Sequence, residues 1–565
     1  MTIKKFSLIL IILGALFFMS CGSDCDGGTC DDLEGESGSE ESKEFRIRMI
    51  GHTCNQETIH QTSLHNVGSL TVSIDSVDGV NIFRRSFAGD EIERSMNISG
   101  IDNAERAVLT ISAFDVRDPN EVKWEGRVDN LTFKKGEKTA VDIILYPVSG
   151  KGCLPNPLNV PRFGHVSTLL PDGRILLTGG FISSQGKTWG AGKSVEIIDT
   201  ESGEIEILAE MNEERAMHGA VALSDGSVVI FGGVRLLEVD NRPIDGYPDL
   251  PYTFNVQAIT VERYMPIYPK RNMRKNNIGS VIANETQTMA LNYSEMPFLP
   301  FQSYVVDDSN PAKITVYMVG GLKGTASAGF EPSDKVFAFD IVDTGIEYTL
   351  SPVREVAAGE KDTSLMPAAG FFQGSLFTVG GRGNDAGNPG AVYSPSGVTG
   401  WGDSEVPNLF YSASYMLGET LYVFGGLQKK SGENIFELEK HYAYNFRMST
   451  GAFQRSDKRL MSWGDSLFFS DVVFNQNKNQ FLVIGGAGGS ENNKADMNSG
   501  SDLVQVVDIN PFNVYDTSPT YRLRFNRILP RGTVGHGNRL FITGGVSSLG
   551  IGGTIVNAVE IDTTL

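Results

Sequence analysis

The chain has 565 residues, 64 of them glycine, and a formal net charge of -20 at pH 7. A chain of this length can bury an ample core, and abundant glycine suits turn-rich β structure. The negative charge argues against nucleic acid or an anionic membrane surface as a partner of the protein body.

The chain opens with the pattern of an export signal. Lys4 and Lys5 precede the run Phe6–Met19, which is apolar except for Ser7 and Gly14. This run of 14 residues is too short to span a bilayer comfortably and has the length of a secretory signal core.

The next residues resemble the bacterial lipobox, in which a cysteine is diacylated and becomes the new N-terminus. Cys21 follows Ser20 where the apolar run stops, and Phe18 replaces the usual leucine three residues before the cysteine. The resemblance implies a signal peptide over residues 1–20 and durable membrane attachment through Cys21, because several acyl chains anchor a protein firmly. An ordinary cleaved signal with an incidental cysteine is the alternative.

Residues 21–44 are expected to form a solvated tether. Glycine, serine, aspartate and glutamate dominate this stretch, and Lys43 is its one cation. Such a composition cannot build a core and repels itself. Gly22 after the cysteine implies, by the sorting rule of such lipoproteins, an outer-membrane location in the cell envelope, with the periplasmic and surface sides both open.

The five cysteines fit an exported protein. With Cys21 lipidated, four remain, and four cysteines allow three disulfide connectivities. We favour Cys25 with Cys30 and Cys54 with Cys153. A zinc site is the rival interpretation, but the spacings lack a Cys-x-x-Cys pair and an oxidising compartment favours disulfides.

Residues 45–149 are predicted to form a small antiparallel β-sandwich. Strands are expected at Leu70–Ile74, Val108–Phe114 and Ala140–Leu145, with Gly, Asn and Asp turns and no helical period. The segment resembles the immunoglobulin-like or transthyretin-like modules that precede large domains in bacterial lipoproteins.

The rest of the chain repeats one unit that ends in a glycine doublet. The intervals between successive doublets are mostly near the roughly 50-residue period of a four-stranded propeller blade. The doublets begin at Gly179, Gly232, Gly320, Gly380, Gly425, Gly485 and Gly544.

The unit repeats in detail. Arg162 and Arg215 each stand 17 positions before the first glycine of a doublet, and His165 and His218 each follow three residues after the arginine. In each copy an Asp-Gly pair between the histidine and the doublet predicts a tight hairpin turn. The continuously apolar second strand suits burial on both faces. A third strand is expected after most doublets, at 195–200, 336–340, 392–395, 442–445, 504–508 and 559–562.

These features, with Trp401 beginning a fourth strand, resemble the kelch repeat. The resemblance implies an all-β fold over residues 150–565, a seven-bladed kelch-type β-propeller. Cys153–Leu158 is expected to pair with the C-terminal blade and close the ring, which removes both sheet edges. Residues 235–297 have no glycine doublet and are interpreted as a loop insertion, although a degenerate eighth blade is the alternative.

Kelch propellers serve as binding platforms, cytoskeletal adaptors and a few enzymes, so the resemblance leaves two enzymatic alternatives. A copper oxidase resembling galactose oxidase needs a cysteine cross-linked to tyrosine, but the propeller contains only Cys153, at its entrance. Its four histidines are assigned structural roles: His165, His218, His441 and His536. Counted back from the doublets, Met366, Tyr411 and Pro530 replace the histidine of the first two copies, which argues against a shared catalytic position.

An isomerase resembling the sialic acid mutarotases is the other enzymatic alternative. It would use polar side chains at one mouth of the channel, for which Glu213, Glu214 and Arg215 are candidates. Solvated loop residues are the simpler interpretation of these three.

A basic and aromatic set in the insertion is the predicted binding site, because recognition usually resides in loops on a rigid scaffold. The sequence thus favours a non-catalytic platform for a protein or glycan, without metal or cofactor; the ligand and the oligomeric state are open. The set comprises Arg263, Tyr264, Tyr268, Lys270, Arg271, Arg274 and Lys275.

Overall fold

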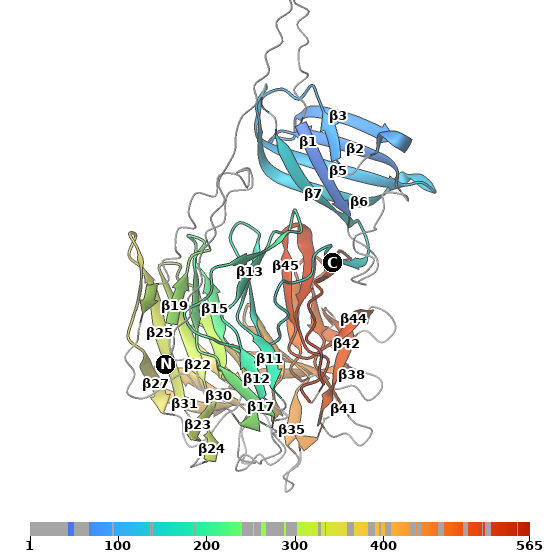
Figure 1. Ribbon diagram of the computed structural model, residues 1–565. Coiled ribbons are helices and arrows are strands. Elements are labelled where there is room, and N and C mark those ends of the chain that lie inside the picture. The colour runs from blue at the N-terminus through green and yellow to red at the C-terminus, as the bar shows by residue number, and fades with distance from the viewer. Residues whose placement is uncertain are drawn as a thin grey trace, which may run out of the picture. The chain divides into compact units, whose positions relative to one another are not determined.

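A computed structural model shows an all-β chain (Figure 1). No helix among the described residues is long and apolar enough to cross a membrane. The residues described are 43–49, 67–92, 95–135, 137, 139–185, 188–239, 252–253, 261–266, 287–289, 302–325, 329–333, 335–358, 366–381, 390–394, 397–401, 408–429, 436–437, 442–460, 468–489, 495–510, 512–514, 521–550 and 552–564.

The N-terminal domain is one curled sheet with the strand order β3-β2-β5-β6-β7-β1-β4. Leu70, Val72 and Ile74 of β2 are buried and alternate with less buried residues, as expected for a strand with one face on a core. The strands are β1 (Lys43–Met49), β2 (Val67–Asp75), β3 (Asn81–Ala88), β4 (Ser95–Ile98), β5 (Ala104–Asp115), β6 (Asp118–Phe133) and β7 (Ala140–Pro147). A short 3-10 turn, η3 (Gly89–Glu91), follows β3.

The three strands expected in this domain are confirmed as β2, β5 and β7, but their assembly differs from the prediction. The β1–β7 pair is parallel, and β6 and β7 pair only at Trp124 with Pro147 and Glu125 with Tyr146. The two halves of the sheet curl around one shared core, so a half-barrel replaces two separate antiparallel layers. Strand periodicity does not specify which edges pair, so the sequence did not reveal the parallel β1–β7 pair.

The remaining chain forms successive antiparallel sheets, each starting with a hairpin, followed by a third strand beside the second (Figure 1). The first has β9 (Val166–Leu169), β10 (Ile175–Thr178), β13 (Val195–Ile198) and β14 (Ile205–Leu208); the second β15 (Gly219–Ala222), β16 (Val228–Phe231), β19 (Val261–Tyr264) and β20 (Gln287–Met289); the third β21 (Ser303–Asp307), β22 (Lys313–Val319), β25 (Lys335–Asp343), β26 (Tyr348–Leu350) and β27 (Arg354–Ala358). Next come β28 (Ala368–Phe372), β29 (Ser375–Val379), β30 (Gly390–Ser394) and β31 (Gly397–Trp401); then β33 (Ala413–Leu417), β34 (Thr420–Phe424), β37 (Tyr442–Arg447) and β38 (Ala452–Arg459). The last two contain β39 (Asp471–Asn475), β40 (Gln480–Ile484), β42 (Ala495–Ile509), β43 (Phe512–Val514) and β44 (Tyr521–Arg527), and then β45 (Arg531–Gly535), β46 (Arg539–Thr543), β47 (Glu560–Asp562) and β8 (Lys151–Cys153).

Short strands follow several glycine doublets and form small extra sheets or extend a large one. They are β11 (Phe181–Gln185), β12 (Thr188–Ala191), β17 (Leu236–Val239), β18 (Tyr252–Thr253), β23 (Leu322–Thr325), β24 (Gly329–Pro332), β32 (Leu409–Phe410), β35 (Leu427–Lys429), β36 (Phe436–Glu437) and β41 (Ala487–Gly489). A 3-10 turn, η5 (His536–Asn538), connects β45 to β46.

The predicted closure between the start and the end of the repeat region is confirmed. β8 pairs antiparallel with β47, with Cys153 opposite Glu560. The Leu154 amide then donates to the Val559 carbonyl at 2.9 Å, and the Leu158 amide to the Asn557 carbonyl at 2.8 Å. The first strands of the first and last sheets, β9 and β45, also lie against each other. This arrangement fits a β-propeller.

The interpretation of residues 235–297 as a loop insertion is wrong, because β17, β18, β19 and β20 all lie within this range. Residues 261–264 form β19, which pairs with β16 as the third strand of the second sheet, Val261 opposite Phe231, and β20 pairs with β19 as the fourth. The third strands expected elsewhere are confirmed. The repeat pattern did not reveal β19, because this strand lies far along the chain from the doublet at Gly232. Its pairing with β16 identifies it as a third strand.

The predicted equivalence of Met366 and Tyr411 with the histidines is also wrong, by one residue. Met217 has a φ of 53° and Tyr411 one of 57°, so Tyr411 corresponds to the residue before His218. Ala413 pairs with Phe424, 12 positions before the doublet at Gly425, whereas Val166 pairs with Thr178, 13 before Gly179. The shorter hairpin shifts a count made from the doublet.

Candidate functional site

The described part of the predicted basic set lies on β19. Tyr264 is 0% exposed and its hydroxyl donates to the Ala209 carbonyl at 2.7 Å, so this residue packs the core. Arg263 is held at the strand end, where it pairs with Asp225 and its Nε donates to Ser227 Oγ at 3.0 Å. Neither side chain belongs to a free loop.

The other members of the set, Tyr268, Lys270, Arg271, Arg274 and Lys275, lie outside the described residues, and their binding role stays a prediction. They follow Pro266 in the connection from β19 to β20. β19 ends at the same end of its sheet as the β15–β16 hairpin turn, because Tyr264 is opposite Val228. The connection therefore starts beside the hairpin turns.

The cysteine predictions are testable at one position. Cys153 is disulfide-bonded, as expected. Cys21, Cys25, Cys30 and Cys54 lie outside the described residues, so lipidation and connectivity stay predictions.

A buried arginine–glutamate pair recurs in three sheets and explains the arginine of the repeat. The carboxylates stand on the third strands, so sequence spacing alone did not reveal them. The Nη2 atom of Arg162 lies 2.6 Å from Glu196. The same atom of Arg215 lies 2.8 Å from Glu262, and that of Arg527 lies 2.8 Å from Glu560.

The same arginines hold the glycine doublets. Arg162 Nη1 donates to the Gly179 carbonyl at 2.7 Å, and Arg215 Nη1 to the Gly232 carbonyl at 2.8 Å. Arg527 makes the equivalent bond to Gly544. The 17-residue spacing therefore places a guanidinium on the carbonyl of the first doublet glycine.

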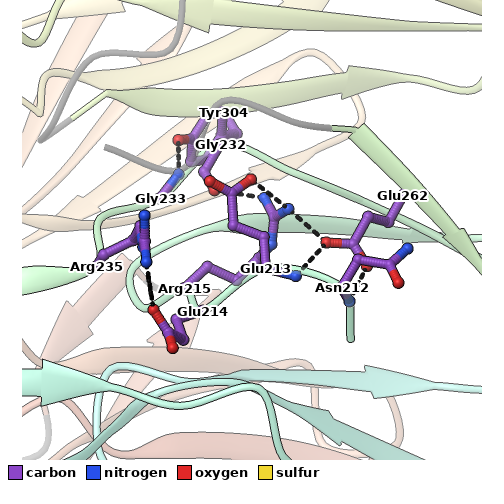
Figure 2. A network of polar contacts seen from close by, with 9 residues as sticks. All are labelled: Asn212, Glu213, Glu214, Arg215, Gly232, Gly233, Arg235, Glu262 and Tyr304. Atoms are coloured by element: carbon purple, nitrogen blue, oxygen red, sulfur yellow. Dashed lines mark hydrogen bonds and ion pairs between the residues drawn. The ribbon is translucent and has the colours of Figure 1, made fainter. Parts of the chain in front are cut away.

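Figure 2 shows the network around Arg215, which contains all three candidates for acid, base or carboxylate clamp. Glu213 Oε2 lies 3.4 Å from Arg215 Nη2, and the Glu213 amide donates to Glu262 at 3.0 Å. Glu214 pairs with Arg235 at 2.7 Å. Arg215 is fully buried and its contacts belong to the framework of the sheet, whereas the Glu214–Arg235 pair is partly exposed.

The two repeat histidines connect neighbouring sheets. His218 Nε2 lies 2.9 Å from Thr178 Oγ1, and His165 Nε2 lies 2.9 Å from Thr543 Oγ1. Burial, reinforced by nearby arginines, lowers the pKa of both histidines well below the usual value, so both are neutral in the folded protein.

We expect these histidines to make the fold acid-sensitive. Below pH ~6.5 they gain protons in the unfolded chain but not in the folded one, so stability present above this pH is lost as pH falls. Each histidine can contribute at most about 1.4 kcal/mol to this loss per pH unit. Urea unfolding above and below pH ~6.5 measures the loss. The variant His165→Asn/His218→Asn should show a flatter pH slope, and an unchanged slope would contradict the assignment.

One end of the repeat sheets is filled by apolar side chains. Phe163, Phe410, Phe468 and Ile528, which precede first strands, join one buried cluster with residues that follow the doublets, such as Trp189. The backbone there forms a chain of bonds between sheets: Met217 N to Gly164 O at 2.6 Å, Gly164 N to Leu529 O at 3.2 Å, Leu529 N to Phe469 O at 3.0 Å, and Phe469 N to Tyr411 O at 3.3 Å. Among the described residues, this end is therefore held together by apolar packing and backbone hydrogen bonds.

A polar cluster that the sequence did not predict joins the starts of three first strands. Arg531 Nη1 is 3.0 Å from Asp471 Oδ1, and Arg531 Nε donates to the His165 carbonyl at 3.0 Å. Asp471 Oδ2 also accepts from the Gly532 amide at 2.7 Å. Three sheets are joined at this point.

Metal ions are bound by groups of ligating side chains. No group of three or more His, Cys, Asp or Glu side chains gathers among the residues that the structure describes. His441 and the side chain of His536 lie outside that set.

Two comparisons with known proteins, one with family models and one with curated proteins, found no match. A search of solved structures matched the "Structure of YjhT" at 14% identity, covering 72% of this chain and 96% of that one, with a TM-score of 0.35.

Proposed function

We propose that this chain is an exported, lipid-anchored kelch-type propeller of seven blades that binds a protein or a glycan without catalysis. The Lys4–Cys21 pattern supports export and anchoring at Cys21. The repeated sheets and the β8–β47 pairing support a closed ring. Each blade would be one repeat sheet, with β19 as the third strand of the second.

The use of the repeat's own polar residues supports a platform over an enzyme. Arg162, Arg215 and Arg527 are buried against glutamates, and both repeat histidines bond to threonines. Since these residues are used in holding the sheets together, recognition falls to the connecting segments. The connection from β19 to β20, which carries Lys270, Arg271, Arg274 and Lys275, is the proposed site.

We expect neutralising those four cations to glutamine to weaken binding to purified anionic glycans or envelope proteins by about 10–100-fold, since rim charges contribute up to about 1 kcal/mol each. Biolayer interferometry on the full chain measures this. Deleting residues 235–297 is unsuitable, because it removes Glu262 and Tyr264 from the core.

The matched control neutralises four exposed cations of the N-terminal domain: Arg84, Arg117, Lys134 and Lys135. Equal weakening in both variants, or none in the first, would reject the β19–β20 connection as the site. If the wild type binds none of the purified glycans and envelope proteins, the binding role itself is rejected.

A further inference from the structure

A cleft of about 420 Å³ lies between the second and third repeat sheets, at their hairpin-turn end. Its walls come from three hairpins, β15–β16, β21–β22 and β25–β26. The lining residues are Ser224, Asp308, Pro311, Ala312, Ile314, Asp343 and Tyr348.

Two aspartates bring negative charge to the cleft. Asp308 and Asp343 form no salt bridge among the described residues, and Asp343 Oδ1 only accepts the Gly345 amide at 2.8 Å. The described cations around it already have carboxylate partners. Arg263 pairs with Asp225, while Lys313 and Arg354 pair with Asp340 at 3.2 and 3.0 Å.

An aromatic ring stands beside these carboxylates. The Tyr348 hydroxyl is 2.7 Å from Ser224 Oγ, which fixes the ring in the wall. Arg263 Cζ lies 5.2 Å from the ring centroid, a cation–π distance. Carboxylates beside an aromatic ring are the surroundings that an organic cation prefers. A hard metal ion would need more oxygen ligands than the two carboxylates offer.

An exposed apolar residue stands in the turn between two of the lining residues, Asp343 and Tyr348. Ile346 is 96% exposed in the turn between β25 and β26, three residues after Asp343 and two before Tyr348. A protein segment with a lysine or arginine next to an apolar residue would match both features. The acidic wall makes this partner complementary in charge.

We infer that this cleft binds a lysine or arginine side chain of a partner protein, with an adjacent apolar residue of that partner on Ile346. The inference rests on the proposed binding role and names a second contact for it, separate from the β19–β20 connection. The cation would lie between Asp308 and Asp343, against the wall that contains Tyr348.

The test uses the full chain and three fluorescein-labelled peptides, Gly-Lys-Ile-Lys-Gly and its Gln and Glu counterparts, read by fluorescence anisotropy. We expect the Lys peptide to bind, the other two to bind at least about tenfold more weakly, and the affinity to fall with salt. Asp308→Asn/Asp343→Asn should weaken binding of the Lys peptide at least about tenfold. Asp308→Lys, at an exposed position with no described side-chain bond, is a second variant with the same expected loss.

The matched control is Asp78→Asn/Glu105→Gln, which changes net charge equally on the N-terminal domain. Equal loss in this control, equal binding of all three peptides, or no loss in the cleft variants would overturn the inference. It is also overturned if the Lys peptide binds only after Lys270, Arg271, Arg274 and Lys275 are neutralised, since the chain's own cations would then occupy the cleft. Glycan binding through the β19–β20 connection would survive all these outcomes, so the two proposals fail separately.

Discussion

Arg215→Met is expected to destabilise the protein by about 3–5 kcal/mol, although it keeps an unbranched aliphatic stem. The loss arises because Glu262, which is fully buried, is left charged without its partner. The Gly232 carbonyl loses a donor as well. Urea unfolding of the full chain, followed by tryptophan fluorescence, measures the change.

The matched control is the double variant Arg215→Met/Glu262→Leu. Removing both charges leaves no unpaired ion, and such replacements of buried pairs are often neutral or stabilising. The amides of Asn212 and Glu213 would still lose their acceptor, so recovery should be incomplete. A single variant as stable as the wild type, or a double variant less stable than the single one, would contradict the role assigned to this pair.

Gly179→Ala is the second change with a large expected effect, about 2–5 kcal/mol of unfolding free energy. Gly179 has a φ of 57°, and an added Cβ would lie 2.1 Å from the Arg215 carbonyl oxygen in the next sheet. Part of the loss is left-handed strain, and part is the backbone displacement needed between two sheets. The same urea measurement applies.

Gly226→Ala separates these two contributions. Gly226 also has a positive φ, 86°, but an added Cβ there has no neighbour within 4 Å. Only the conformational cost of about 1–2 kcal/mol should appear. If both variants lose the same unfolding free energy, the close approach between the sheets is not the reason that the doublet begins with glycine.

Some structural features were readable from short stretches of sequence. The doublets ended second strands because both glycines adopt positive φ, as at Gly179 and Gly180, which only glycine does without strain. The Asp-Gly turn at 225–226 and the apolar strand after it were equally local. The outer strand near Cys153 could be predicted because ring closure requires a partner for β47.

The candidate site was much less predictable. Tyr264 belonged to a plausible basic and aromatic loop by composition, yet it packs in a core. Glu213 and Arg215 suggested acid–base chemistry, yet their contacts belong to the framework. Residue type shows what a side chain can do, while its burial and partners depend on strands that arrive from elsewhere in the chain.

The repeat, most of its strands and the need for glycine follow from the local sequence, because turn geometry, left-handed backbone and strand periodicity involve neighbouring residues. Three relations appear only in the folded chain: Glu262 pairs with Arg215, β19 is the third strand of the second sheet, and Asp308, Asp343 and Tyr348 share a cleft. These relations join residues that are distant along the chain. They depend on strand register and hairpin length, and a shift of one residue in a hairpin changes which side chains meet.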